Sequence, residues 1–293
     1  MPAHADDRCA RFRALLMGGA CVHPATVYDP MSGLMAEELG FEAGIFAGAI
    51  ASLTILAAPD RVLMTLSELA DQARRVTRVC ALPFIVDGDH GYGNALNVMR
   101  TVEELEAVGV AALSIEDTEL PQPFGGGARP RFCSIEEGVA KMRAARAARS
   151  NPDFSIVGRT SAGAALGLDQ AIERGRAYAA AGVDALFFPG VRDAAEVEAL
   201  AAAAFGVPMI IGGLAPDAVS RDWLAGRGVR LSLPGHVTYF AGLRAVYDAM
   251  RTLRETESFE GVAPASAGDV ARWSRAAVWE GRAVEHLGPA GRG

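Results

Sequence analysis

Cysteine is scarce in this sequence: 293 residues contain four, and no two of them form a C-x-x-C pair. A structural zinc site and a disulfide framework both need clustered or regularly paired cysteines, so this spacing argues against both. Most of the four are expected to be small buried side chains. Cys133 alone follows a segment rich in glycine and proline, which leaves a chemical role open for it.

Long apolar runs and basic runs are also missing. The first twenty residues mix acids and arginines and contain no stretch apolar enough for a signal-peptide core or a membrane span. The net charge of -7 and the pI near 5.3 would repel phosphate backbones and anionic lipids. The sequence therefore predicts a cytoplasmic protein that binds neither nucleic acid nor membrane.

What is present is an alternation of short apolar segments with longer segments of helical period, which is typical of parallel βα units. Eight strands are predicted, at residues 20–27, 43–47, 84–86, 112–115, 155–158, 185–188, 208–211 and 230–233. Periodicity alone also allows an open doubly wound sheet. The strand number, the chain length and the lack of a G-x-G-x-x-G motif after the first strand favour a (β/α)8 TIM barrel.

The C-terminal segment is extra to such a barrel. We expect the catalytic barrel over residues 1–260 and a helical tail over residues 261–293. Trp273 and Trp279 lie in that tail, where exposure of both indole rings to water would be costly. The tail is therefore predicted to pack on a neighbouring subunit.

Carboxylates cluster where the predicted strands end. Asp87 and Asp89 follow the strand at 84–86 in a glycine-rich loop, although Asp-Gly is also a good turn former. A second acidic pair, which begins with Glu116, ends the next strand at the same level of the barrel. Converging acids raise each other's pKa unless a cation neutralises them, so this face is expected to bind a hard divalent cation such as Mg²⁺. Asp60 is a candidate fourth acid.

Two further residues follow strand ends. Arg159 comes after the strand at 155–158, where its guanidinium can grip a substrate carboxylate at two points; a structural ion pair with one of the acids is the alternative. His236 follows the last strand and can hydrogen-bond a substrate or relay a proton, or merely cap a loop. His90 has the same two interpretations.

These residues carry a family resemblance. The run D-G-D-H-G-Y-G-N at 87–94, then Glu116–Asp117 and then Arg159–Thr160, resembles the isocitrate lyase/phosphoenolpyruvate mutase superfamily over about residues 13–247. The similarity is closest to its oxaloacetate decarboxylase branch, as in Gly235–His236. The resemblance implies a (β/α)8 barrel whose eighth helix region swaps between subunits of a homotetramer. It also implies that the protein binds Mg²⁺, or alternatively Mn²⁺, together with a small keto acid.

The resemblance also assigns roles. Asp87 would bind the metal directly, Arg159 would hold the substrate carboxylate and His236 would face the substrate. The acids that would act mainly through bound water are Asp60, Asp89 and Glu116. Backbone N–H groups for the substrate would come from Ala47, Gly48 and Ala49.

The reaction that the resemblance implies is decarboxylation of oxaloacetate, to pyruvate, or of a related 2-keto diacid. The metal would stabilise the enolate that forms when the C3–C4 bond breaks. A lyase of the family would carry Cys, Lys and His in the loop at Pro121–Gly127, and the phosphonate branch would carry Lys there; this loop has none of them. Ala49 and Gly212–Gly213 depart from the more polar decarboxylase pattern, so the pocket is expected to be roomier and a 3-substituted substrate is a candidate.

Two alternative functions are compatible with the same residues. One is a carbon–carbon lyase that acts on a 2-hydroxy or methyl-substituted dicarboxylate. The other is a barrel that binds keto acids with little turnover. The physiological substrate is not fixed by these residues.

Overall fold

The computed structural model describes residues 5–125 and 129–288. Residues 126–128, which include part of the Pro121–Gly127 loop, lie outside the described residues. The chain forms two compact units, Met1–His236 and Val237–Gly293. The domain boundary expected at 260/261 falls inside the second unit, and the packing of the tail on another subunit stays a prediction.

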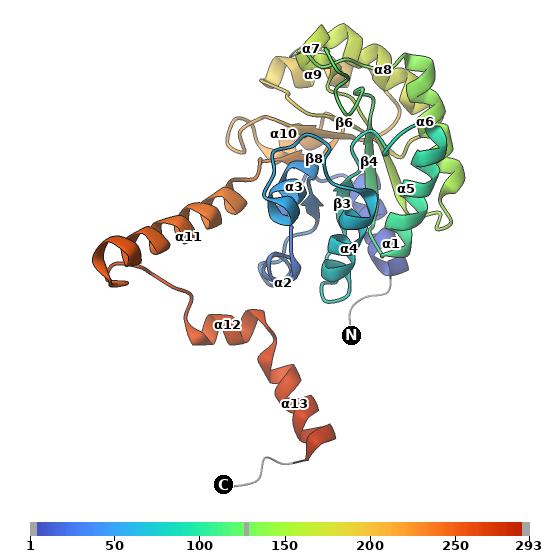
Figure 1. The fold of residues 1–293 in the computed structure, drawn as a ribbon. Helices are drawn as coiled ribbons and strands as arrows, with labels where there is room; N and C mark the ends of the chain where they lie inside the picture. The colour runs from blue at the N-terminus through green and yellow to red at the C-terminus, as the bar shows by residue number, and fades with distance from the viewer. Residues whose placement is uncertain (1–4, 126–128, 289–293) are drawn as a thin grey trace. The chain divides into compact units, whose positions relative to one another are not determined.

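Eight parallel strands form the centre of the first unit and pair in the order in which they occur along the chain (Figure 1). They are β1 (Ala25–Thr26), β2 (Gly44–Phe46), β3 (Phe84–Asp87), β4 (Ala112–Glu116), β5 (Ser155–Arg159), β6 (Ala185–Phe188), β7 (Met209–Gly212) and β8 (Val229–Leu233). Val22 forms a parallel bridge with Leu231 of β8, so the segment before β1 meets the last strand. The sheet thus curls back on itself, and the predicted (β/α)8 fold is confirmed.

Helices connect the strands and lie around them in Figure 1. They are α1 (Ala5–Met17), α2 (Pro30–Glu38), α3 (Gly48–Leu56), α4 (Leu66–Thr77), α5 (Ala95–Ala107), α6 (Ile135–Ala148), α7 (Ala162–Leu166), α8 (Leu168–Ala181), α9 (Ala194–Ala202) and α10 (Arg221–Ala225). Local chemistry fixes where they begin. At α4, the Thr65 hydroxyl accepts the Glu68 N–H and the Glu68 carboxylate accepts the Thr65 N–H, which satisfies two amides that the helix leaves unpaired.

The core lies between the sheet and these helices. Phe84 on β3 and Ile156 on β5 are fully buried, as are Leu105 on α5 and Tyr178 on α8. Removing an aliphatic or aromatic side chain of this size from water stabilises a fold by about 1.5–3 kcal/mol. This apolar layer holds the strands rigidly, so the residues at their C-terminal ends have fixed positions.

The second unit consists of α11 (Val237–Thr256), α12 (Ala267–Trp273) and α13 (Ala276–Leu287). One face of α11 exposes apolar side chains at spacings of three and four residues, and these are Phe240, Leu243, Val246, Met250 and Leu253. No side chain of α12 or α13 is buried. Over the part of the chain that the structure describes, no helix is both long and apolar enough to cross a membrane.

Candidate active site

Three strands end in charged residues at neighbouring positions. Asp87 is the last residue of β3, Glu116 the last of β4 and Arg159 the last of β5. In the strand register, Asp87 pairs with Ser114, and Glu116 pairs with Arg159. The parallel sheet therefore places these three side chains together at the C-terminal end of the barrel, which is where TIM-barrel enzymes carry out their chemistry.

Asp87 is surrounded by donors. Its Oδ2 atom lies 2.6 Å from Arg159 Nη1 and 3.4 Å from the backbone nitrogen of Gly48. Its Oδ1 atom accepts the Asp89 N–H at 3.3 Å and the Ser114 hydroxyl at 3.4 Å. The ion pair that sequence reasoning left open for Arg159 is thus present, and it is made with Asp87.

The segment Ala47–Ala49 is the beginning of a helix. Ala47 is the N-cap residue of α3 and Gly48 its first residue, and the Gly48 N–H points at Asp87 Oδ2. A Cβ atom at Gly48 would lie 3.2 Å from Asp89 Oδ1 and 3.4 Å from Asp87 Oδ2. Glycine at this position lets the helix start approach both carboxylates closely.

Carboxyl groups outnumber basic groups in this cluster. Burial, reinforced by repulsion from Asp87, raises the pKa of Asp89 to about 8. Burial also raises the pKa of Glu116, although the nearby guanidinium of Arg159 opposes the shift. Burial disfavours the charge on Arg159 itself, but Asp87 and Glu116 outweigh this effect and raise its pKa. One guanidinium therefore faces three carboxyl groups, and full ionisation of the three would require further positive charge.

This donor set fits a divalent cation bound mainly through water. Carboxylate oxygens are the ligands that Mg²⁺ prefers, and Mg²⁺ usually retains several waters and takes only one or two carboxylates directly. Over residues 5–125 and 129–288, no three His, Cys, Asp or Glu side chains lie close enough together to enclose an ion on their own. The geometry is therefore compatible with direct binding by Asp87 and water-mediated contacts to the other acids, which stay a prediction.

A cavity of about 220 Å³ opens beside Asp87 and Arg159. Its other lining residues are Ile45, Ala47, Ala49, Asp60, Phe187, Pro189, Gly190, Gly212, Gly213, Leu233, Gly235 and His236. Charged and polar groups thus share the cavity with an apolar wall. Sequence reasoning missed Phe187 and Leu233 in this wall, because an apolar residue at a strand end has the same local pattern as any core residue.

Asp60 and His236 join this cavity from loops. Asp60 is exposed, and partial desolvation followed by repulsion from Asp87 raises its pKa. His236 Nδ1 lies 3.0 Å from the Thr26 hydroxyl, which orients the imidazole ring. Burial lowers the pKa of His236, so the ring is uncharged at neutral pH.

His90 and Asp117 lie close to the acidic cluster in the sequence but contact other parts of the fold. His90 is buried, and its carbonyl oxygen accepts a hydrogen bond from Lys141. Asp117, the second acid of the pair at the end of β4, is fully buried and bonds to Arg174 and Tyr178 on α8. Only Glu116 of that pair takes part in the acidic cluster. The sequence gives no local signal for the Arg174 contact, because the two residues are 57 positions apart.

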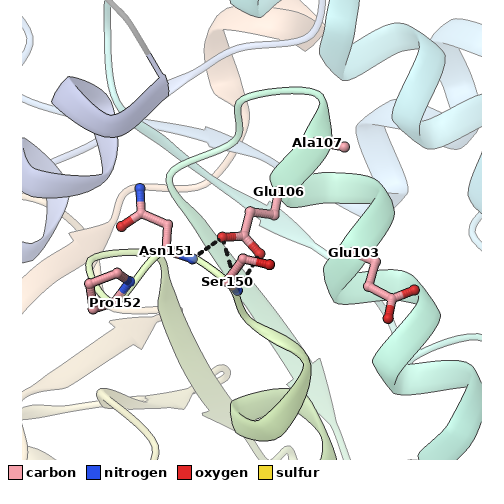
Figure 2. Close-up of a pocket in the computed structure, with 6 residues that line it drawn as sticks. All are labelled: Glu103, Glu106, Ala107, Ser150, Asn151 and Pro152. Carbon is pink, nitrogen blue, oxygen red and sulfur yellow. Dashed lines mark hydrogen bonds between the residues drawn. The ribbon is translucent and has the colours of Figure 1, made fainter.

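Figure 2 shows a second, larger depression, which lies between the end of α5 and the loop before β5. It measures about 630 Å³ and is lined by Glu103, Glu106, Ala107, Ser150, Asn151 and Pro152. The Glu106 carboxylate accepts the backbone N–H groups of Ser150 and Asn151, which ties the loop before β5 to α5. None of these six lining residues is basic, and the hydrogen bonds of Glu106 give that glutamate a structural role.

Comparisons with known proteins agree on one family. Residues 12–254 match the family described as phosphoenolpyruvate phosphomutase. An oxaloacetate decarboxylase from Bradyrhizobium diazoefficiens is 48% identical over 285 residues, which cover 96% of this chain and 98% of the relative. The crystal structure of a phosphoenolpyruvate phosphomutase from Streptomyces platensis subsp. rosaceus superposes with a TM-score of 0.88 at 27% identity, covering 95% of this chain and 99% of the other. A phosphonopyruvate hydrolase in complex with oxalate and Mg²⁺ superposes with a TM-score of 0.84 at 26% identity, covering 96% and 99%.

Proposed function

The chain belongs to the phosphoenolpyruvate phosphomutase family and is a carbon–carbon lyase, and from this premise we propose that it is a Mg²⁺-dependent decarboxylase of oxaloacetate or a related 2-keto diacid. The observation that carries the proposal is the cavity in which Asp87, Arg159 and His236 meet. The cavity contains carboxyl groups that a cation can neutralise. It also contains a guanidinium that can bind a substrate carboxylate, and an uncharged imidazole.

The metal would be held by this chain's carboxylates. Asp87 would bind Mg²⁺, or Mn²⁺, directly, and the acids that would act through bound water are Asp60, Asp89 and Glu116. When bound, the cation would supply positive charge that stabilises the negative charge developing on the substrate. A low-dielectric cavity makes this stabilisation stronger than it would be in water.

The remaining groups bind and orient the substrate. Arg159 would grip a carboxylate at two points, and the N–H groups of Ala47, Gly48 and Ala49 would supply further donors at the start of α3. When the C3–C4 bond of the diacid breaks, C4 leaves as CO₂ and the electron pair remains as an enolate over C2 and C3. Protonation at C3 then gives the 2-keto monoacid, which is pyruvate for oxaloacetate. His236, oriented by Thr26, is placed to hydrogen-bond the substrate during these steps.

We further propose that the protein forms a homotetramer and works in the cytoplasm. The exposed apolar face of α11 suits burial against other copies of the chain in a homotetramer, since isolated apolar stripes of this kind usually mark protein interfaces. Cys21 and Cys133 are free thiols, and all four cysteines are buried. Unpaired thiols are the normal state in a reducing compartment such as the cytoplasm.

The direct test is an oxaloacetate assay that records pyruvate and CO₂ separately, with and without EDTA. We expect equal amounts of both products, and loss of the reaction when the metal is chelated. Asp87→Asn assayed at the same Mg²⁺ concentration controls for decarboxylation by free metal ions. Cleavage of a 2-hydroxy or methyl-substituted dicarboxylate into two smaller acids, without release of CO₂, would support the alternative carbon–carbon lyase reaction. Saturable binding of oxalate with no turnover of any keto acid would support a binding protein.

A further inference from the structure

We propose that Arg159 acts as a placeholder for the divalent cation: without metal its guanidinium occupies Asp87, and cation binding to Asp87 displaces it toward the substrate carboxylate. This inference rests on the metal site of the proposed function. It reconciles the two interpretations of Arg159 that the sequence leaves open, since the residue would be an ion-pair partner in one state and a substrate ligand in the other.

The contact between the two side chains supports mutual exclusion. Arg159 Nη1 lies 2.6 Å from Asp87 Oδ2, at the short end for a charge-assisted hydrogen bond. The other carboxylate oxygen, Oδ1, already accepts hydrogen bonds from the Asp89 N–H and the Ser114 hydroxyl, close to the end of β3. Apart from the guanidinium, Oδ2 has one donor, the Gly48 N–H at 3.4 Å, so Oδ2 is the oxygen with more room for a cation once Arg159 has left it.

A cation and this guanidinium cannot share Oδ2. A Mg²⁺ ion lies about 2.0–2.1 Å from a carboxylate oxygen and keeps bulky waters around it. A guanidinium nitrogen held 2.6 Å from the same oxygen would meet those waters and face a double positive charge in a site shielded from solvent, where repulsion is strong. Cation binding therefore requires Arg159 to leave Asp87.

The cavity wall offers a second position for the Arg159 guanidinium, where its N–H groups can bind a substrate. Its Nε atom is buried and has no hydrogen-bond partner among residues 5–125 and 129–288, and the nearest Glu116 oxygen is 3.4 Å away from it. Its guanidinium carbon lies 5.5 Å from the centre of the Phe187 ring, and both side chains line the cavity. The displaced guanidinium thus moves along the cavity wall with a free donor that a substrate carboxylate can use.

Two consequences can be measured. The resident guanidinium weakens cation binding to the substrate-free protein, because the cation must first break an ion pair. The same residue strengthens binding of a dicarboxylate once the metal is in place. Removing it should therefore change the two affinities in opposite directions, whereas general damage to the site would weaken both.

The experiment measures Mn²⁺ affinity by EPR titration of the full-length, substrate-free protein, and then oxalate affinity of the Mn²⁺-saturated protein by calorimetry. For Arg159→Gln we expect Mn²⁺ to bind about tenfold more tightly and oxalate about tenfold more weakly, the size of change that neighbouring groups at metal sites produce. Arg159→Lys keeps the charge but loses the second donor arm, so it is expected to fall between Gln and the native residue. It also serves as the test if the Gln variant does not fold.

The matched control is Arg61→Gln, which removes a positive charge close to Asp60 from an exposed position. We expect it to change Mn²⁺ affinity less than about twofold, because exposed charges are screened by solvent. The placeholder role is overturned if folded Arg159 variants bind Mn²⁺ with unchanged or weaker affinity. The proposed function is tested separately. It is contradicted if the native protein does not decarboxylate oxaloacetate, or does so equally well in EDTA, whatever the Arg159 variants show.

Discussion

Glu116 and Arg159 are the last paired residues of β4 and β5, and Glu116 Oε2 lies 3.4 Å from Arg159 Nε. The strand register alone brings these side chains together, since each ends its strand at the same level. Glu116 is almost fully buried and has little contact with water. Burial therefore disfavours the charge of Glu116 unless a positive group, such as the Arg159 guanidinium or a cation, lies beside it.

We expect Glu116→Gln to weaken Mg²⁺ binding by about tenfold and to lower kcat/KM by about 10- to 100-fold, because outer partners of a metal site commonly have effects of this size. The amide keeps the shape of the side chain, so the melting temperature should change little. Metal titration and oxaloacetate kinetics measure both quantities. Glu119→Gln, a partly exposed residue paired with Arg131, is the control; an equal loss in that variant would contradict a specific role for Glu116.

The stability of the metal-free protein is expected to depend on pH through Asp89. Burial and the nearby Asp87 raise the pKa of Asp89 to about 8, whereas the unfolded chain has a value of about 3.9. Between these values the folded state retains a proton that the unfolded state has lost. The contribution of Asp89 is thus present at low pH and is lost as the pH rises toward 8.

Asp89→Asn should remove this dependence. We expect the variant to melt at a higher temperature than the native protein at pH 9 without metal, and to gain less stability from added Mg²⁺. Thermal melts from pH 6 to 9, with and without MgCl₂, measure both effects. Asp217→Asn, at an exposed position, should leave the profile unchanged. A parallel pH profile for the native and Asp89→Asn proteins would show that Asp89 does not titrate in this range.

Gly212 is expected to set the size of substituent that the cavity accepts. A methyl group at this position would lie 3.5 Å from Phe187 Cε2 and 3.7 Å from Leu233 Cβ, so it would fill the apolar wall without a clash. C3 is the only carbon of oxaloacetate that bears hydrogen, so an apolar substituent must be attached there. We expect Gly212→Ala to lower kcat/KM for 3-ethyloxaloacetate about tenfold relative to oxaloacetate, as one methylene typically does.

The control for this change is Gly226→Ala, at the end of α10 on the far side of β8, where the added methyl meets only ordinary contacts. Its substrate preference should equal that of the native protein. If native and Gly212→Ala proteins have the same ratio of rates across a 3-alkyl series, the apolar wall does not contact the substrate at C3.

Cys133 is expected to be chemically inert. Burial, with the adjacent charge of Asp117, raises the pKa of its thiol to about 11. Because the thiolate is the reactive form, its alkylation by iodoacetamide should be slow at pH 8 and rise about tenfold with each pH unit below the pKa. Cys133→Ala should retain activity within about threefold. Rapid labelling at pH 8, followed by mass spectrometry, or a large loss of activity, would restore a chemical role for this thiol.

The sequence predicts most of the fold because the relevant signals are local. The strands at 84–86 and 155–158 are found within one residue of their expected ends, since apolar β-branched segments bounded by turn residues have few alternatives. The first strand is shorter than expected: residues 20–27 contain only the pair Ala25–Thr26 and the separate bridge at Val22. Pairing in this segment depends on its contacts with β2 and β8, which the local sequence pattern does not reveal.

The sequence by itself determined the barrel and the acids at its strand ends, because period, length and position along the chain are properties of local segments. Only the tertiary structure decided how those groups share their charges: it pairs Arg159 with Asp87, and it turns Asp117 toward Arg174. It also placed Phe187 and Leu233 in the same cavity as the charged groups. These relationships depend on strand register and on helices far apart in the chain, and register is a property of the packed sheet rather than of any one strand.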